Sequence, residues 1–262
     1  MVNQALLEQA KAVFSLSSKY DLETVKSRSV GGNVLYNLES LVRNMTITPD
    51  MNVLDLACGK AVSSVFLAKE FGARVFAVDS EYGASENQAF IEESGVAGNV
   101  IPLKLDARQL PFAENYFDCI IITNSFTYFG TDDKLLPYLL KFLKPGGQIG
   151  VADICFRSEV HTLADVPEFL KHDFSTYWYQ IHALDWWINK WLKPALITIE
   201  ASGEVSRPEY EIMRNIYLEF IKETPQEPFG KALSRDTDNF LSFFYLVGQR
   251  TNKKVNEEHA AE

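Results

Sequence analysis

Two acids and a glycine in the stretch VLDLACGKAVSSVFLAKEFGARVFAVDS, residues 53–80, have the spacing of a nucleotide-type site. Asp55 and Gly59 come at the end of one apolar run, and Asp79 comes at the end of the next. A glycine there lets a ligand approach the backbone, and the amides that open the following helix favour a carboxylate or phosphate. An acid after the second run can accept hydrogen bonds from two ribose hydroxyls. The stretch therefore predicts a nucleoside site.

The loop after Asp55 has one glycine, whereas a dinucleotide pyrophosphate needs the G-x-G-x-x-G pattern for close backbone approach. Asp55 would also repel a diphosphate and attract an ammonium group. A nucleoside with a zwitterionic amino-acid tail therefore suits the loop better than a dinucleotide does. An NAD(P)-dependent oxidoreductase on a related fold remains the first alternative, because an acid at the position of Asp79 also occurs in NAD-binding folds.

Apolar strand-like runs alternate with helix-like runs along the chain. We expect helices over 3–19, 33–45, 61–71, 84–94, 132–143 and 209–223, and strands over 53–56, 75–78, 100–105, 118–123, 148–154, 196–201 and 240–250. This order predicts an α/β fold with a Rossmann-like, doubly wound, mostly parallel sheet of seven strands. In such a sheet the ligand crevice lies beyond the carboxyl ends of the strands, where the strand order reverses.

Composition narrows the class of protein. With 262 residues and 47% hydrophobic content, the chain can bury one large core, and we expect a single domain. A net charge of −10 without any basic cluster argues against a nucleic-acid partner. The chain has no run of 18 apolar residues, so we expect no membrane insertion. Three cysteines without CxxC spacing argue against disulfides and a zinc site, so we expect no metal and a cytoplasmic location.

Within this domain, residues 1–262, the texture of the sequence changes along the chain. We expect N-terminal helices (1–48), a cofactor-binding core (49–155), an aromatic insertion (156–195), the last two strands (196–250) and a tail (251–262). The insertion would cover the acceptor, meaning the molecule that reacts with the cofactor. A wall of tyrosine and tryptophan in the insertion would attract a cationic acceptor. The helical spacing of Trp186, Trp187 and Trp191 favours a place in the core over a place at the site.

Five segments between residues 20 and 155 resemble, in order, the class I S-adenosylmethionine-dependent methyltransferases. They are VLDLACGKA, VFAVDS, LDARQLPF, FDCIIITNSFTYF and LKPGGQIGVADI. Upstream, SRSVGGNVL is similar to the segment before the core in methyltransferases of small amines and quinones, including the ubiquinone/menaquinone and phosphoethanolamine types. The resemblance implies S-adenosyl-L-methionine as cofactor, S-adenosyl-L-homocysteine as product, a small-molecule acceptor, and a last strand that runs antiparallel.

The resemblance also implies roles for particular residues at the cofactor. Ala57, Cys58 and Gly59 would line the methionine moiety, with Asn124 and Ser125 near it, Asp79 would hold the ribose, and Ser80 and Glu81 would lie beside the adenine. Asp106 would contact the adenine amino group with Ala107 packing nearby, Ser29 and Gly32 would close the carboxylate end, and Asp55 belongs to the same set. Ala61 departs from the family, which commonly has a second glycine there, and it puts the loop conformation in question.

Methyl transfer from a sulfonium requires an acceptor lone pair in line with the methyl carbon and exclusion of water. A general base is needed only if the acceptor arrives protonated. Candidates over the crevice are Tyr128, His161, Tyr177, Tyr179 and His182. Structural roles for the two histidines, and a non-catalytic cofactor- or partner-binding module, remain alternatives. The sequence leaves open the acceptor atom and the oligomeric state.

Overall fold

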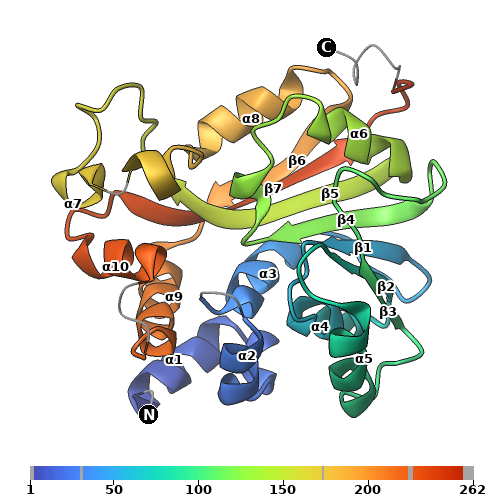
Figure 1. Ribbon diagram of the computed structural model, residues 1–262, viewed down its shortest axis with the longest axis horizontal. Helices are drawn as coiled ribbons and strands as arrows, with labels where there is room; N and C mark the ends of the chain where they lie inside the picture. Colours follow the sequence, from blue (N-terminus) through green and yellow to red (C-terminus); the bar gives the residue numbers. More distant parts are fainter. Residues whose placement is uncertain (1–2, 30–31, 173, 224–226, 256–262) are drawn as a thin grey trace.

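Seven strands pair in the order β3-β2-β1-β4-β5-β7-β6 and form one twisted sheet (Figure 1). They are β1 (Asn52–Leu56), β2 (Arg74–Asp79), β3 (Val100–Lys104), β4 (Phe117–Thr123), β5 (Leu143–Phe156), β6 (Ile197–Glu204) and β7 (Leu241–Arg250). The pairs among β1 to β5 are parallel, whereas β7 runs antiparallel to both β5 and β6. The predicted fold class, with its antiparallel last strand, is confirmed.

The computed structural model describes residues 3–29, 32–172, 174–223 and 227–255. Its α-helices are α1 (Gln4–Val13), α2 (Leu22–Arg28), α3 (Val34–Val42), α4 (Val62–Phe71), α5 (Ala84–Glu93), α6 (Leu135–Phe142), α7 (Glu168–Lys171), α8 (Leu184–Leu192), α9 (Arg207–Phe220) and α10 (Pro228–Arg235). Helices α3, α4 and α5 cover one face of the sheet, and α6 and α8 cover the other (Figure 1). Within the described ranges no helix has the length and apolar character needed to span a bilayer.

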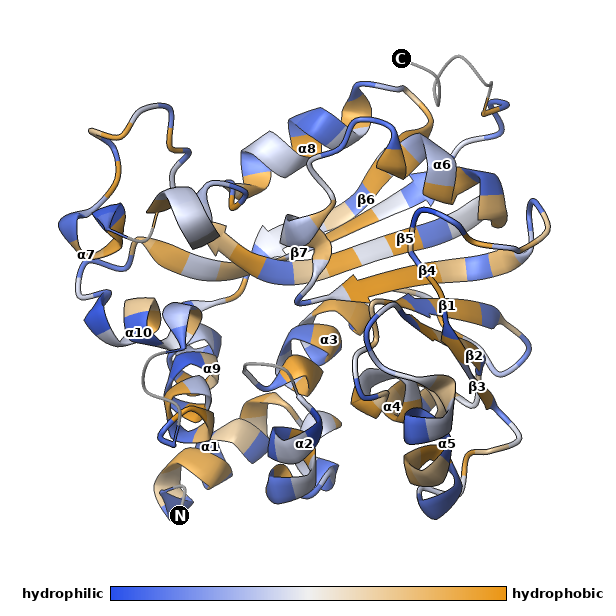
Figure 2. Ribbon diagram, viewed as in Figure 1, coloured by the Kyte–Doolittle hydropathy of each residue, from blue (hydrophilic) through white to orange (hydrophobic). Residues whose placement is uncertain are grey.

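Burial on both faces explains why the central strands read as continuous apolar runs. In β4, Cys119 and Ile121 join the core under α3 and α4, while Ile120 and Ile122 join the core under α6 and α8. All four side chains are at most 1% exposed. Figure 2 shows hydrophobic residues along the central strands and polar residues distributed over the surrounding helices. The two cores hold the strand ends, and with them the site, in fixed positions.

Several element boundaries differ from the expected ones for local reasons. The first helix ends at Val13, and a separate α2 starts after Asp21, whose carboxylate caps the amide of Thr24 at 2.8 Å. The helix expected from Asp132 begins later, because that side chain accepts the amide of Lys134 in a turn. Strand β5 starts at Leu143 rather than at 148. Helix α10 was not predicted.

The aromatic segment after β5 forms α7, a π-helical turn (Phe174–Trp178) and α8. Trp178, Trp187 and Trp191 are each at most 1% exposed. Trp187 and Trp191 also pack against Phe126 in the short 3-10 helix η2 (Phe126–Tyr128), with ring centroids 5.1 and 5.9 Å away. These tryptophans are therefore core residues, and they support the segment that follows β4.

Candidate active site

A cavity of about 290 Å³ lies at the carboxyl ends of β1, β2 and β4, where the strand order reverses. The register pairs Leu56 with Val78 and Asp55 with Ile121, so the residues after all three strands leave the sheet at one edge. The cavity is lined by Arg28, Ser29, Val34, Ala57, Cys58, Gly59, Val62, Ser63, Asp79, Ser80, Glu81, Tyr82, Thr123, Asn124, Ser125, Tyr128 and Phe129. Nine of the thirteen residues predicted at the cofactor are among them.

Asp79 organises this cavity through backbone amides. Its Oδ2 accepts the amide of Gly59 at 2.8 Å, and its Oδ1 accepts the amides of Glu81 at 2.8 Å and Tyr82 at 3.1 Å. The carboxylate thus joins the loop after β1 to the loop after β2. Since a carboxylate has about four lone-pair positions, capacity for a ligand hydroxyl remains.

The loop after β1 contains two alanines in the left-handed backbone region, Ala57 (φ 60°) and Ala61 (φ 63°). Ala61 stands directly before α4 and is fully buried. Alanine therefore adopts here the conformation for which glycine is usual, at a cost of roughly 1–2 kcal/mol. The departure from the family at Ala61 leaves the backbone path of the loop intact.

Asp55 has a different place from the one expected. Its carboxylate is 1% exposed and accepts the hydroxyls of Ser63 at 2.7 Å and Ser64 at 2.5 Å, and it is not among the residues lining the cavity. Burial raises the pKa of Asp55 to about 6, although the two serine hydroxyls oppose the shift. Asp55 thus fixes the start of α4 beneath the loop, which corrects the expectation that it meets a ligand ammonium group.

Polar groups without partners remain on the cavity wall. The hydroxyls of Ser29 and Thr123 are buried and have no hydrogen-bond partner within the described part of the chain. Such groups cost free energy unless a ligand or water satisfies them. Arg28, which the sequence analysis missed, supplies the one basic side chain among the described residues lining this cavity, and its guanidinium lies 4.0 Å from the Phe90 ring centroid.

Three other residues predicted at the cofactor also lie outside this lining. Asp106 is exposed after β3 and accepts the amide of Arg108 at 2.8 Å, and its neighbour Ala107 is half-buried. Gly32 lines an adjacent cavity, where an added Cβ would lie 2.1 Å from the Tyr217 ring. The roles expected for Asp106 and Ala107 at adenine stay predictions.

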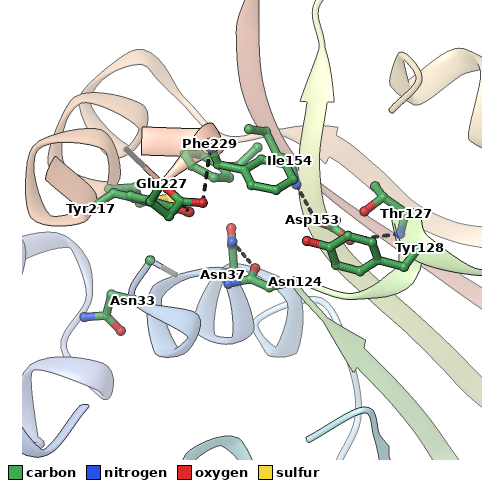
Figure 3. A pocket seen from close by; sticks show the side chains of 13 residues that line it. Asn33, Asn37, Asn124, Thr127, Tyr128, Asp153, Ile154, Tyr217, Glu227 and Phe229 are labelled. Carbon is green, nitrogen blue, oxygen red and sulfur yellow. Dashed lines mark hydrogen bonds between the residues drawn. The ribbon is translucent and has the colours of Figure 1, made fainter. Parts of the chain in front are cut away.

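That adjacent cavity, of about 150 Å³, adjoins the first one at Asn124 and Tyr128. Figure 3 shows Asp153, Thr127 and Tyr128 on one side, Tyr217 and Glu227 on the other, and the Asn37–Asn124 pair between them. Its lining consists of Gly32, Asn33, Asn37, Asn124, Thr127, Tyr128, Asp153, Ile154, Met213, Tyr217, Glu227, Phe229 and Phe243. None of the described residues in 156–195 lines it. The cover of this cavity therefore comes from α9 and the start of α10, and the expectation that 156–195 cover the acceptor stays a prediction.

Asp153 is the buried acid of this second cavity. It is 4% exposed, with Oδ1 accepting the amide of Ile154 at 2.8 Å and Oδ2 accepting the amide of Thr127 at 3.2 Å. Burial raises the pKa of Asp153 to about 6, against the opposing effect of these bonds. The sequence analysis missed it, although an acid near the end of the apolar run GVADICF was a visible sign.

Of the candidate bases, Tyr128 lines both cavities. Desolvation, followed by the charges of Asp153 and Glu227, raises the pKa of Tyr128 to about 12, so the phenol is a hydrogen-bond donor at neutral pH. Tyr128 is also 60% exposed, and its role as a general base stays a prediction.

The other candidates lie elsewhere. His161 is exposed, and Tyr179 is 53% exposed. His182 stacks on Trp186, with ring centroids 3.6 Å apart, and its Nδ1 lies 2.7 Å from Glu159 Oε1. None of these three lines either cavity, so the geometry does not place the predicted bases at an acceptor. The side chain of Tyr177 lies outside the described residues.

A mostly parallel seven-stranded sheet with a crevice at its switch point defines a doubly wound α/β protein. A family model described as "Methyltransferase domain" matches residues 53–147. The ubiquinone/menaquinone biosynthesis C-methyltransferase UbiE of Methylococcus capsulatus is 31% identical over 175 residues, which cover 65% of this chain and 66% of that protein. The chain spans 56–66% of the length of the curated relatives named UbiE from Methylococcus capsulatus and Vibrio cholerae.

Solved structures share the fold at low sequence identity. Phosphoethanolamine N-methyltransferase 2 of Haemonchus contortus, solved with phosphomonomethylethanolamine and S-adenosylhomocysteine, gives a TM-score of 0.70 at 17% identity and covers 94% of this chain and 60% of that one. The [4+2]-cyclase SpnF gives 0.68 at 16%, covering 91% and 96%. Residues 53–147 thus match a methyltransferase domain, and the chain has the fold of these S-adenosylmethionine-dependent methyltransferases.

Proposed function

We propose that the protein transfers a methyl group from S-adenosyl-L-methionine to a small-molecule acceptor, with S-adenosyl-L-homocysteine as the second product. The observation that carries the proposal is the 290 Å³ cavity at the switch point, whose wall combines the Asp79 carboxylate with the unpaired hydroxyls of Ser29 and Thr123. A nucleoside with an amino-acid tail carries ribose hydroxyls, an ammonium and a carboxylate, and these groups match that wall.

Each end of such a ligand has a candidate partner in the cavity. Asp79 would accept a ribose hydroxyl, and Arg28 would pair with the carboxylate, since a guanidinium binds a carboxylate through two parallel hydrogen bonds. Asn124, shared by both cavities, would lie where cofactor and acceptor meet. When bound, S-adenosyl-L-methionine supplies an activated methyl group. The residues of this chain hold and orient the two reactants and exclude water from between them.

The test separates three possibilities. We expect S-adenosylhomocysteine to bind in an isothermal titration and NAD to show no heat; the reverse result would identify an oxidoreductase. Labelled S-adenosylmethionine should then pass its methyl group to an acceptor in a panel of amines, phenols, thiols and quinols, detected by mass spectrometry. SpnF shares the fold and is a [4+2]-cyclase, so cofactor binding without any methylated product would contradict methyl transfer.

The net charge supports a class of acceptor, and the free cysteines support a cellular location. A net charge of −10 supports a small-molecule acceptor rather than a nucleic acid, whose phosphates the protein would repel. Cys58, Cys119 and Cys155 are buried and free. Because three unpaired thiols persist best under reducing conditions, we infer a cytoplasmic location.

A further inference from the structure

The second cavity offers hydrogen-bond acceptors and negative charge without any balancing basic side chain among the described residues that line it. Asp153 and Glu227 are its acids. Asn37 adds an amide whose Oδ1 is buried and unpaired, while its Nδ2 donates to Asn124 at 2.5 Å. A phosphate or carboxylate placed here would face two acids in a poorly solvated space, where like charges repel strongly.

The two acids have different tasks. Glu227 precedes α10 and accepts the amides of Phe229 at 3.1 Å and Gly230 at 2.6 Å, together with the hydroxyl of Tyr217 at 3.3 Å. These three bonds use most of its acceptor capacity and fix one wall. Asp153 lies on the other side, next to Tyr128 and thus near the cofactor cavity (Figure 3). Asn37 Oδ1 is therefore the unpaired acceptor left for a ligand. Asp153, which also accepts the main-chain amides of Thr127 and Ile154, supplies the negative charge beside it.

The rest of the lining is largely apolar. Ile154, Met213, Phe229 and Phe243 supply hydrocarbon and ring surface, and Phe243 and Met213 are less than 5% exposed. A cavity of about 150 Å³ with such walls holds a molecule of about the size of benzene. The part of an acceptor that enters therefore has an apolar body of about one ring.

Building on the methyl transfer proposed above, we propose that this cavity takes a neutral or cationic acceptor of about one ring in size, whose N–H or O–H group donates to Asp153 and Asn37, and that it rejects phosphates and carboxylates. In the transfer, a cationic acceptor first passes a proton to the Asp153 carboxylate, which frees the lone pair of its nitrogen. The acceptor nitrogen or oxygen then forms a bond to the methyl carbon, and the sulfur–carbon bond breaks with its electron pair going to sulfur. A neutral acceptor gives its proton to the Asp153 carboxylate in this second step.

Four single-ring probes test the charge selection on the full-length protein. Phenol and benzylamine are the neutral and cationic probes, and benzoate and phenyl phosphate are the anionic ones. Ligand-observed NMR measures each affinity with and without saturating S-adenosylhomocysteine. We expect phenol or benzylamine to bind at least tenfold more tightly than either anion. An anion that binds as tightly as the better of the two, or no binding by any probe, would overturn the proposal.

Variants locate the binding and keep the test independent of folding defects. Asp153→Asn should weaken phenol or benzylamine binding at least tenfold. It should also reduce the difference in affinity between that probe and benzoate. Asn37→Leu should weaken the same probe severalfold. Asp185→Asn removes an exposed carboxylate outside the cavity and should change nothing. Unchanged probe binding in both cavity variants would overturn the assignment.

The same titrations separate this inference from the proposed function. S-adenosylhomocysteine that fails to bind would refute the cofactor assignment, whereas the discrimination among the four probes would still be measurable in the protein alone. Tight cofactor binding combined with a preference for benzoate or phenyl phosphate would refute the acceptor assignment and leave the methyltransferase proposal standing.

Discussion

The two cavities share Asn124 and Tyr128 but are built in different ways. The wall of the first comes from loops at neighbouring strand ends, and Asp79 holds two of them by accepting three main-chain amides. The wall of the second depends on side chains brought from α3, η2, β5, α9, α10 and β7. A wall held by one carboxylate and the paths of neighbouring loops suits a ligand common to many enzymes. A side-chain wall can change with each acceptor.

The largest effect should follow from removing one charge from the first wall. Asp79→Asn replaces a carboxylate oxygen with an NH₂ group, which would point a donor at a donor amide and lose a charge-assisted ribose bond. We expect S-adenosylhomocysteine affinity to fall by about 4 kcal/mol, roughly a thousandfold, in an isothermal titration. Phenol or benzylamine binding in the second cavity should stay within threefold.

Asp185→Asn is the matched control for that experiment, because Asp185 is an exposed acid that lines neither cavity. It should change cofactor affinity less than threefold. If Asp185→Asn proves as harmful as Asp79→Asn, the loss of affinity reflects the net charge of the protein and not a ribose contact. If Asp79→Asn leaves the affinity for S-adenosylhomocysteine unchanged, the assignment of Asp79 to the ribose is contradicted.

We expect the free energy of unfolding to depend on pH through Asp153, which lines the second cavity. The pKa of Asp153 is raised to about 6 by burial, against roughly 3.9 in an unfolded chain. The folded protein therefore holds an extra proton between these values. The resulting stability is fully present below pH 3.9 and is lost as pH rises through 6, an effect of about 3 kcal/mol. Asp153→Asn should gain about that much, relative to the parent protein, between pH 4 and pH 7 in urea unfolding.

Activity should show the opposite dependence, since proton transfer requires the Asp153 carboxylate. Methyl transfer to a protonated acceptor should rise through pH 6 and lose that rise in Asp153→Asn. Burial also raises the pKa of Asp55 to about 6, but Asp55 lines neither cavity. Asp55→Asn should therefore change the pH dependence of stability and keep the rise in activity. A rise retained by Asp153→Asn and lost by Asp55→Asn would contradict the assignment.

The contrast between the walls also explains which parts could be predicted. Asp79 and Gly59 lie next to strand ends whose apolar runs are legible in the sequence, and parallel strands bring such ends together. Asn37, Asp153 and Glu227 come from segments far apart in the chain, and nothing local marks them as neighbours. Asn37 is on α3, Asp153 is on β5 and Glu227 precedes α10, so their meeting depends on how these elements pack.

The aromatic insertion also shows a limit of prediction from the sequence. Composition alone suggested a cover over the acceptor, but burial of Trp187 and Trp191 against Phe126 places the rings in the core. Clustered aromatics report a large buried area and do not identify which face of the sheet they cover. The helical spacing of the tryptophans, which favours the core, gave the correct placement of Trp187 and Trp191.

The smallest effect concerns the loop residue that departs from its family. Ala61→Gly should relieve the strain of a positive φ, while glycine also adds freedom to the unfolded chain, so we expect a net gain of about 0.5 kcal/mol in urea unfolding. Ala68→Gly, within α4 at ordinary helical geometry, should instead lose about 1 kcal/mol or more. Because the first wall depends on backbone path rather than on the Ala61 side chain, S-adenosylhomocysteine affinity should stay within twofold. A loss of stability equal to that of Ala68→Gly would mean that the left-handed conformation carries no strain, and a large loss of affinity would mean that this wall depends on side chains after all.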